Sequence, residues 1–179
     1  MPTLLIIDIQ NDYFPGGAFP LVGPEKAAAA ASDLLAEFRS NGDPVVHLQH
    51  IWDEPDAAFM RPGTEGVEIH DLVAPIDGET LITKESPNGF LDTDLESVLR
   101  GLDSDSLVVA GMMTSMCVDA TVRAASDLNF DVTLAHDACA APDLEWGGVT
   151  VPAAQVHTAF IAALAGEYAT LASSAELLD

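Results

Sequence analysis

The chain has 179 residues, 49% of them hydrophobic, and its 29 acidic side chains against 6 lysines and arginines give a formal net charge of -23. A chain of this length is expected to fold as one domain over residues 1–179. Its high hydrophobic content excludes a disordered tail. The charge excludes nucleic acid and acidic membrane surfaces as partners, because both require basic residues against phosphate.

The start of the chain and its two cysteines bear on the compartment. The segment Met1 to Ile9 is short, contains Asp8 and lacks a basic leader, so we do not expect a signal peptide. A single disulfide between Cys117 and Cys139 would be an unusual framework for a domain of this size. We therefore expect a reduced, cytoplasmic environment. The scarcity of lysine is also typical of proteins that work in high salt, where screening weakens self-repulsion.

In chain order, the first half alternates apolar strands with one helix. Thr3–Asp8 is a continuous apolar run that ends in an acid, as in a buried strand. Pro24–Asn41 has proline at its start, an alanine-rich body and a glycine directly after it, which predicts a helix. Short apolar runs predict strands over Pro44–Gln49 and Thr80–Thr83. The long irregular stretch between them, residues 50–78, is of a length that indicates a function.

The second half continues the alternation. The predicted elements are a short helix over Asp92–Arg100, a strand over Ser106–Ala110, a helix over Thr114–Asn129, a strand over Asp131–His136, a helix over Thr150–Ala165 and a strand over Tyr168–Ala172. Near-continuous apolar strands that alternate with helices predict a three-layer α/β/α fold. We expect a six-stranded parallel sheet with helices on both faces, in a Rossmann-like arrangement.

Three reactive side chains follow strands of this predicted sheet. Asp8 ends the first strand, Lys84 follows the third and Cys117 follows the fourth. Because ligands of such sheets bind outside the carboxyl ends of the strands, we expect all three on one edge. Cys117 also lies in the first turn of a predicted helix, where unpaired N–H groups and the helix dipole favour a thiolate.

These residue types suit covalent hydrolysis. As an ammonium, Lys84 would lower the pKa of the Cys117 thiol, and Asp8 would accept its proton and return it to a leaving group. Acyl transfer to sulfur would be followed by hydrolysis of the thioester, with the backbone N–H groups of Met113 and Cys117 stabilising the oxyanion. Each side chain also has a structural alternative: Asp8 as a turn former, Lys84 as a surface charge, Cys117 as a small buried hydrophobe. Because all three are expected at the same edge of the sheet, a catalytic role is favoured over these alternatives.

Further residues are candidates for contact with a substrate. The predicted pocket lining consists of Gln10, Asn88, Phe90 and Trp146, with Asn88 as a hydrogen-bonding wall, Phe90 as an apolar wall and Trp146 at the entrance. Asp12 could orient the site or form a turn. Arg61, in the long irregular stretch, could meet a substrate carboxylate or form a surface ion pair.

Besides Lys84, five segments are distinctive: LLIIDIQNDYF at 4–14, PGTEGVEIH at 62–70, SPNGF at 86–90, GMMTSMCVDATVRAA at 111–125 and HDACA at 136–140. Together they resemble the isochorismatase-like cysteine hydrolases, which include nicotinamidases, N-carbamoylsarcosine and ureidoacrylate amidohydrolases, and isochorismatases. The resemblance covers essentially the whole chain and implies the fold of that family. It also matches Asp8, Lys84 and Cys117 to a catalytic triad and implies a cis peptide bond between Met112 and Met113.

One departure concerns metal binding. In the nicotinamidase branch an Asp-x-His pair follows the second strand, whereas His50 and Trp52 occupy the corresponding positions here. His47 and His50 are three residues apart, so on an extended strand they face opposite sides. We therefore expect no zinc or iron site, and the remaining histidines are interpreted as structural. Phosphate-binding glycine motifs are absent, so no nucleotide cofactor is expected.

The sequence thus predicts a cofactor-independent cysteine hydrolase that cleaves a C–N bond of a small amide, carbamoyl or ureido compound. One alternative is vinyl-ether hydrolysis of an isochorismate-like compound, which needs no thiol, so Cys117 argues against it. Another is a thiol redox or binding protein that merely keeps the fold. The predicted helix Thr150–Ala165 is nearly uncharged, as subunit contacts are, so a homo-oligomer is expected.

Overall fold

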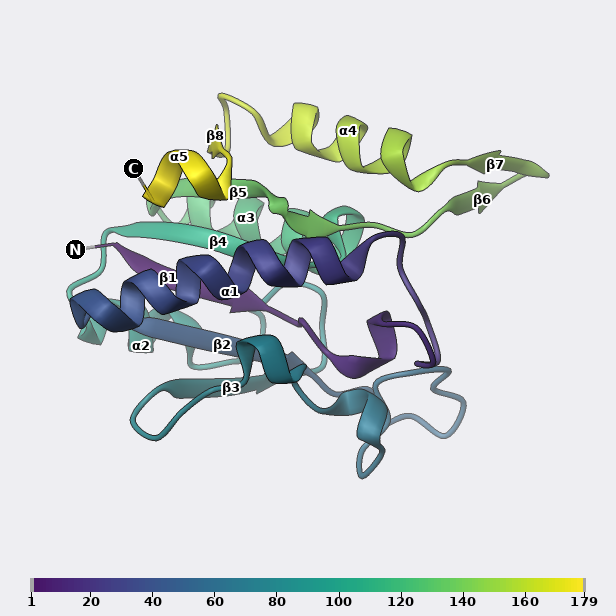
Figure 1. Ribbon diagram of the computed structural model, residues 1–179, viewed down its shortest axis with the longest axis horizontal. Helices are drawn as coiled ribbons and strands as arrows, with labels where there is room; N and C mark the ends of the chain where they lie inside the picture. The colour runs from purple at the N-terminus through teal and green to yellow at the C-terminus, as the bar shows by residue number, and fades with distance from the viewer. Residues whose placement is uncertain (1, 179) are drawn as a thin grey trace.

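The computed structural model describes residues 2–178. Its centre is a six-stranded parallel sheet with the strand order β3-β2-β1-β4-β5-β8 (Figure 1). The strands are β1 (Thr3–Ile7), β2 (Val45–His50), β3 (Thr80–Lys84), β4 (Ser106–Met112), β5 (Asp131–Ala140) and β8 (Thr170–Ala172). Every residue of β1 is buried, as its continuous apolar run predicts for a strand covered on both faces.

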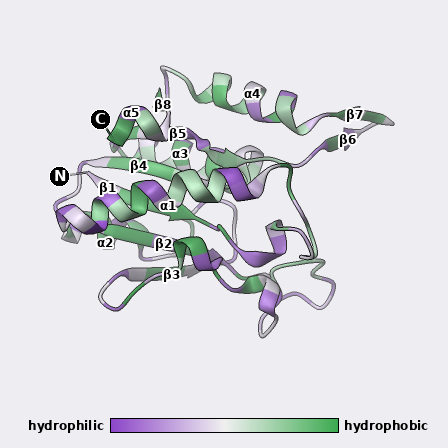
Figure 2. Ribbon diagram, viewed as in Figure 1, coloured by the Kyte–Doolittle hydropathy of each residue, from purple (hydrophilic) through white to green (hydrophobic). Residues whose placement is uncertain are grey.

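Helices cover both faces of the sheet (Figure 1). One face carries α1 (Pro24–Asn41) and α5 (Ser174–Leu178), and the other carries α2 (Leu95–Gly101), α3 (Asp119–Asp127) and α4 (Ala153–Leu164). Each face has its own cluster of buried apolar side chains, and the central strands β1 and β4 are hydrophobic along their length (Figure 2). The predicted three-layer α/β/α architecture is confirmed. No helix among residues 2–178 has the length and apolar character needed to cross a membrane.

The helix predicted over Thr114–Asn129 is divided in two. Its first residues, Thr114–Val118, form a π-helical turn in which the Val118 N–H donates to the Met113 carbonyl over 3.2 Å. The regular helix α3 begins only at Asp119. Such wider turns occur frequently at functional sites, and this one holds Cys117.

The segment before α4 was predicted to be helical from Thr150, and this prediction is wrong. Instead, β6 (Leu144–Trp146) and β7 (Val149–Val151) form an antiparallel hairpin that projects from the body (Figure 1). Gly147 and Gly148 both have positive φ, as a tight hairpin turn requires. The β-branched run Val149–Val151 favours a strand, and Pro152 disfavours helical backbone at the residue before it.

A charged network joins α1 to the long connection between β2 and β3. Arg39 Nε lies 2.7 Å from Glu79 Oε1, and the buried His47 Nε2 lies 2.9 Å from Glu79 Oε2. Although burial raises it, the pKa of Glu79 is lowered to about 2, because Arg39, the Ile76 N–H and His47 all bond the carboxylate. Burial lowers the pKa of His47, so its imidazole is neutral. The carboxylate thus ties two elements together.

We expect Glu79→Gln to destabilise the fold in a pH-dependent way. A folded pKa below the unfolded value of 4.5 stabilises the protein above pH 4.5, and this contribution is lost as the pH falls towards 2. Because the pair of Arg39 and Glu79 is partly solvated, the free energy of unfolding at pH 7 should fall by roughly 1–2 kcal/mol in the variant. Urea unfolding of wild type and variant across this pH range measures it, with the exposed Glu68→Gln as control. A difference in stability between wild type and Glu79→Gln that does not change with pH contradicts the expectation.

Candidate active site

The carboxyl ends of β1, β3 and β4 bring three predicted residues together. Asp8 directly follows β1, Lys84 is the last residue of β3, and Cys117 lies in the π-helical turn after β4. Lys84 Nζ lies 2.6 Å from Asp8 Oδ2. One atom each from Asp8, Cys117 and His50 lie within 4.8 Å of one another. The expected convergence on one edge of the sheet is therefore observed.

Unusual backbone conformations position these side chains. Asp8 has a φ of 50°, which is uncommon outside glycine and turns the chain away from the direction of β1. Gly111 in β4 packs so closely on the Ile7 carbonyl that a Cβ would collide with it. The peptide bond between Met112 and Met113 is cis, as the family resemblance implied.

The thiol of Cys117 is only 3% exposed, and this burial decides its ionisation. Burial and the neighbouring Asp8 carboxylate raise its pKa well above the usual value for cysteine, and the Lys84 ammonium offsets only part of that rise. The thiol is therefore protonated at neutral pH. The expectation that Lys84 holds Cys117 as a resting thiolate is wrong, because it underestimated the depth of burial. A base must take the proton when the sulfur reacts.

Asp8 is well suited to be that base. Its Oδ2 pairs with the Lys84 ammonium over 2.6 Å, whereas its equally buried Oδ1 accepts no hydrogen bond from the described part of the chain. Buried acceptors without a donor are rare in native structures and call for an explanation. Next to Cys117, the free lone pairs of Asp8 can accept the thiol proton.

Lys84 organises the polar side of the site. Besides Asp8, its ammonium donates to the Ser86 carbonyl over 3.0 Å and lies 3.2 Å from His50 Nδ1. Burial alone would lower the pKa of Lys84, but the neighbouring Asp8 carboxylate raises it above the usual value. An ammonium only donates, so His50 Nδ1 must accept and the ring proton is on Nε2. Burial, then Lys84, lowers the pKa of His50, which keeps the imidazole neutral.

Gln10 lies behind the cavity and does not line it, contrary to prediction. Its side chain is fully buried, and its amide bonds the backbone of His50 at the end of β2 and of Val67 in the β2–β3 connection. Nε2 donates to the carbonyls of His50 over 2.9 Å and Val67 over 2.6 Å, and Oε1 accepts from the His50 N–H over 2.9 Å. Gln10 therefore positions His50.

The other three residues predicted to contact substrate also lie away from the cavity. Asn88 Oδ1 accepts from the Phe90 N–H over 2.9 Å, which is a local turn interaction. The Phe90 ring packs 5.9 Å from that of Phe130, in the core beneath α2 and α3. Trp146 is 89% exposed on the projecting hairpin. Each prediction relied on position along the chain, which does not set the direction of a loop side chain.

A cavity of about 350 Å³ opens beside Cys117. Its walls are mostly aromatic or apolar, and its lining consists of Tyr13, His50, Trp52, Phe59, Glu85, Pro87, Met113, Met116 and Cys117. Met113 and Cys117, the predicted oxyanion-hole residues, are both present. Tyr13 and Phe59 were not predicted to belong to the site, although aromatic residues after β1 and in the long connection were a signal for them. The size of the cavity suits a small molecule.

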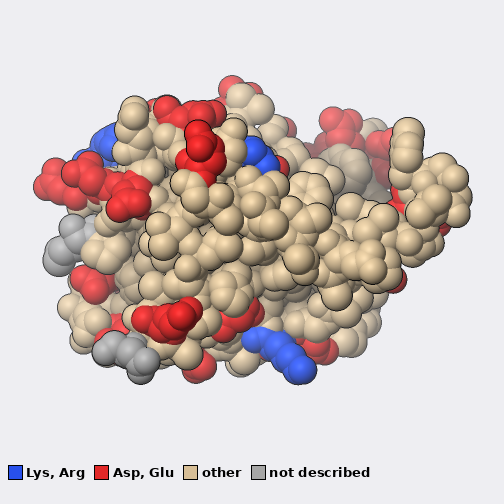
Figure 3. Space-filling view, turned by 90° about the horizontal axis from the view of Figure 1, so that it is seen from above, with Lys and Arg blue, Asp and Glu red and all other residues tan. Residues whose placement is uncertain are grey.

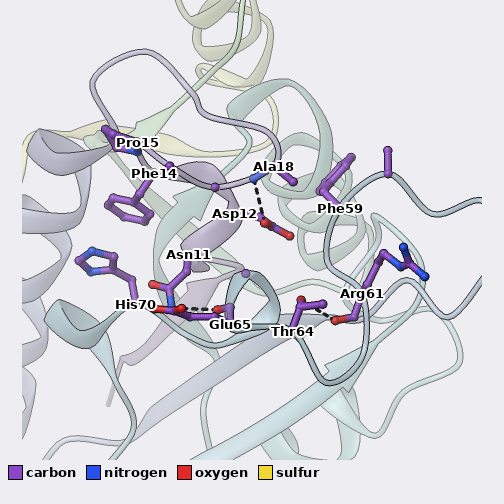
Figure 4. Close-up of a pocket in the computed structure, with 14 residues that line it drawn as sticks. Asn11, Asp12, Phe14, Pro15, Ala18, Phe59, Arg61, Thr64, Glu65 and His70 are labelled. Carbon is purple, nitrogen blue, oxygen red and sulfur yellow. Dashed lines mark hydrogen bonds between the residues drawn. The ribbon is translucent and has the colours of Figure 1, made fainter.

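A larger cavity of about 690 Å³ shares the Phe59 wall (Figure 4). The Asp12 carboxylate at its base is bonded by the Ala18 N–H over 3.0 Å and by the Met60 N–H over 2.6 Å. Gly66 packs directly on this carboxylate, where a Cβ would collide. Asp12 therefore fastens two loops, and Arg61 lies at the rim of this cavity rather than beside Cys117. Because the Asp12 carboxylate in this larger cavity is already hydrogen-bonded, the cavity is a weaker candidate for the reaction site than the one beside Cys117.

The residues after β2 do not fit the metal site of the nicotinamidase branch. Asp8, His50 and Cys117 are close enough to share a cation. However, the His50 Nδ1 lone pair and one Asp8 oxygen already face the Lys84 ammonium, which a cation would have to displace. Trp52 takes the place of a further imidazole. His47 lies away from His50, bonded to Glu79, as the strand alternation predicted.

Comparison with known proteins gives a consistent result. Residues 2–176 match the model of the isochorismatase domain. The uncharacterized isochorismatase family protein YddQ of Bacillus subtilis is 50% identical over 176 residues, which cover 98% of each chain. The crystal structure of a putative isochorismatase hydrolase from Oleispira antarctica superposes with a TM-score of 0.95 at 50% identity, covering 99% of this chain and 95% of that one.

Relatives with named activities are more distant. A streptothricin hydrolase of Streptomyces noursei is 37% identical over 171 residues, covering 92% of this chain and 60% of the relative. A ureidoacrylate amidohydrolase of Azorhizobium caulinodans is 24% identical over 169 residues, covering 76% of this chain and 74% of the relative. These proteins are hydrolases of different compounds, so similarity alone does not define a substrate.

The charges around Cys117 predict opposite effects of two substitutions on its reactivity. Asp8→Asn removes a negative neighbour and should lower the thiol pKa, so alkylation by iodoacetamide at pH 8 should become faster even though hydrolysis is lost. Lys84→Met should slow alkylation. Peptide mass spectrometry separates Cys117 from Cys139, which serves as the internal control. Slower alkylation of the Asp8→Asn variant contradicts this account of the site.

Proposed function

The chain belongs to the isochorismatase family of hydrolases, and we propose that it is a cysteine hydrolase that cleaves a C–N bond of a small amide, carbamoyl or ureido compound. One observation carries this proposal. A buried, protonated thiol lies at a small cavity beside a carboxylate with free lone pairs, and an ammonium holds that carboxylate in place. These are the parts that covalent acyl transfer requires.

In the first half of the reaction, Cys117 Sγ attacks the carbonyl carbon of the substrate while Asp8 takes the thiol proton. The electron pair of the carbonyl moves to its oxygen, which the backbone N–H groups of Met113 and Cys117 stabilise. Asp8 then passes its proton to the substrate nitrogen. The C–N bond breaks, ammonia or an amine leaves, and an acyl thioester remains on Cys117.

In the second half, water enters the cavity and gives a proton to Asp8 as it attacks the thioester carbon. The C–S bond breaks and Asp8 returns the proton to sulfur, which restores the neutral thiol. The sum is one amide and one water converted into one acid and one amine or ammonia. Lys84 keeps its proton throughout and holds the charge of Asp8 between the two transfers.

His50 forms a polar part of the cavity wall, with one ring nitrogen within 4.8 Å of the Cys117 sulfur. With Nδ1 turned to Lys84, its neutral ring offers the Nε2–H to the cavity as a donor for a carbonyl or ureido oxygen. Apart from Glu85, the remaining lining is mostly aromatic and apolar, so a small planar amide or ureido group flanked by apolar surface suits it best. No metal takes part in this scheme, because Lys84 supplies the positive charge that pairs with Asp8.

Vinyl-ether hydrolysis is a weaker candidate, because protonation of an enol ether leaves the thiol without a role. A purely structural thiol is weaker still. The unpaired Oδ1 of Asp8 and the burial of the ion pair between Asp8 and Lys84 would destabilise the fold without a compensating purpose.

We expect Cys117→Ala to lower turnover by at least ~10³-fold, since attack by sulfur is lost. Hydrolysis of nicotinamide, N-carbamoyl amino acids and ureido acids is followed by release of ammonia. Rapid-quench intact-mass spectrometry should show an acyl adduct on wild type that is absent from the variant. Cys139→Ala, which changes the other buried cysteine, is the matched control. Turnover that survives Cys117→Ala would instead support the vinyl-ether alternative or another chemistry.

A second prediction concerns His50. Replacement by Gln keeps a side-chain donor, whereas Leu removes it, so His50→Leu should lower kcat/KM by about 10²-fold and His50→Gln by less. Because the imidazole is neutral in the working range, neither variant should shift the acidic limb of the pH profile. A shift of that limb, or equal losses in both variants, contradicts the proposed role as a donor.

A further inference from the structure

Three aromatic side chains in the lining of the Cys117 cavity pack against one another. Tyr13, Trp52 and Phe59 all line this cavity. The centroid of the Phe59 ring lies 5.5 Å from that of Trp52 and 6.0 Å from that of Tyr13. The planes of Trp52 and Phe59 meet at 89°, so their faces point in different directions. Groups of aromatic rings in such arrangements bind alkylated ammonium ions, which are attracted to the negative faces of the rings.

The charges in the cavity also favour a positively charged occupant. Among the described residues of its lining, Glu85 is the one carboxylate, and no lysine or arginine is present. Glu85 is exposed and takes part in none of the ion pairs of residues 2–178. His50 is neutral, and the Lys84 ammonium is paired with Asp8. An anion in this cavity would therefore meet a carboxylate and no free cation.

The surroundings of the cavity are acidic as well. A neighbouring cavity of about 390 Å³ shares Glu85 with the Cys117 cavity, and its lining adds Asp53 and Asp92. Arg61 lines the larger cavity beyond Phe59 and not the one beside Cys117. The charged side chains on the face of the molecule in Figure 3 are mostly acidic, in keeping with the net charge of -23. Such a field attracts cations to the site and repels anions.

We propose that the substrate carries an alkylated ammonium group close to the amide that is cleaved. The ammonium lies against Trp52 and Phe59 with Glu85 as its counter-ion, while the carbonyl carbon lies at the Cys117 sulfur. Because the cavity has a volume of only about 350 Å³, few bonds separate the two groups. This inference rests on the proposed function and adds a substrate class to it. The reaction is unchanged: one water converts the amide into an acid and ammonia or an amine.

Other substrate charges account for less of the lining. A neutral amide suits the aromatic rings but leaves Glu85 without a partner, and an anionic amide is repelled by it. A simple ammonium group can pair with Glu85, but its strong hydration opposes close contact with the rings. An alkylated ammonium can use both, because its methyl groups pack on apolar surface while its charge faces the rings and the carboxylate.

Three small amides test the preference for charge. Glycine betaine amide carries a trimethylammonium group, 3,3-dimethylbutanamide has carbon in place of that nitrogen, and malonamate carries a carboxylate. We expect kcat/KM for the cation to exceed that for its neutral isostere by about 10-fold, with still slower hydrolysis of the anion. Each value, measured by ammonia release, is divided by the rate of alkaline hydrolysis to remove differences in intrinsic reactivity. Equal corrected values for the cation and the neutral amide overturn the inference.

Variants locate the source of the preference. Glu85→Gln should lower the ratio of the cation to the neutral amide by about 5-fold. Glu145→Gln removes the same charge from the exposed strand β6, and it should leave the ratio unchanged. Trp52→Leu should also lower the ratio, whereas Trp52→Phe, which keeps an aromatic ring, should preserve most of it. A ratio that is equal in Glu85→Gln and Glu145→Gln overturns the assignment of Glu85.

Binding to Cys117→Ala separates this inference from the proposed function, because it needs no turnover. With Trp146→Phe added, Trp52 is the sole tryptophan, and its emission reports on the cavity. Betaine amide should bind about 10-fold more tightly than 3,3-dimethylbutanamide, and less so in molar salt, which screens Glu85. Equal or undetectable binding of the two overturns the inference. Preferential binding of the cation without hydrolysis of any amide by wild type would contradict the proposed function alone.

Discussion

The buried ion pair between Lys84 and Asp8 is the interaction on which the site depends. Neither side chain is exposed, and burial of two charges is unfavourable unless they are well paired. The parallel sheet supplies that pairing, because β1 and β3 both end at the edge where the two charges meet. The pair in turn sets the chemistry of its neighbours. It gives Cys117 a base, fixes the tautomer of His50 and places positive charge where a metal would otherwise lie.

The loops that follow the strand ends form the rest of the active site. Gln10 clamps the backbone of His50, and Asp12 fastens two loops under Gly66, so the aromatic wall of the cavity depends on residues that contact no substrate. This arrangement explains why the segments 4–14 and 62–70 are as distinctive as the one around Cys117. Residues of these two segments fix the loops around Cys117, which the ends of the strands alone would leave exposed.

The sequence was sufficient for the fold and for Asp8, Lys84 and Cys117, because continuous apolar runs locate parallel strands and the ends of such strands share an edge. It was insufficient for Gln10 and Trp146. Their surroundings depend on the path of the β2–β3 connection and on a hairpin that interrupts a helix-like pattern. The ionisation of Cys117 was also mispredicted. Position near a helix start favours a thiolate, but the depth of burial is a tertiary property and outweighs it.

The central claim is that Cys117 rests as a neutral thiol and gives its proton to Asp8 only during reaction. The most direct test is the infrared difference spectrum between wild type and Cys117→Ser at neutral pH, in which the band of Cys139 cancels. The account predicts an S–H stretching band that belongs to Cys117 and persists until the solution is strongly alkaline. Absence of that infrared band at neutral pH, together with the ultraviolet absorbance of a thiolate, would contradict the account.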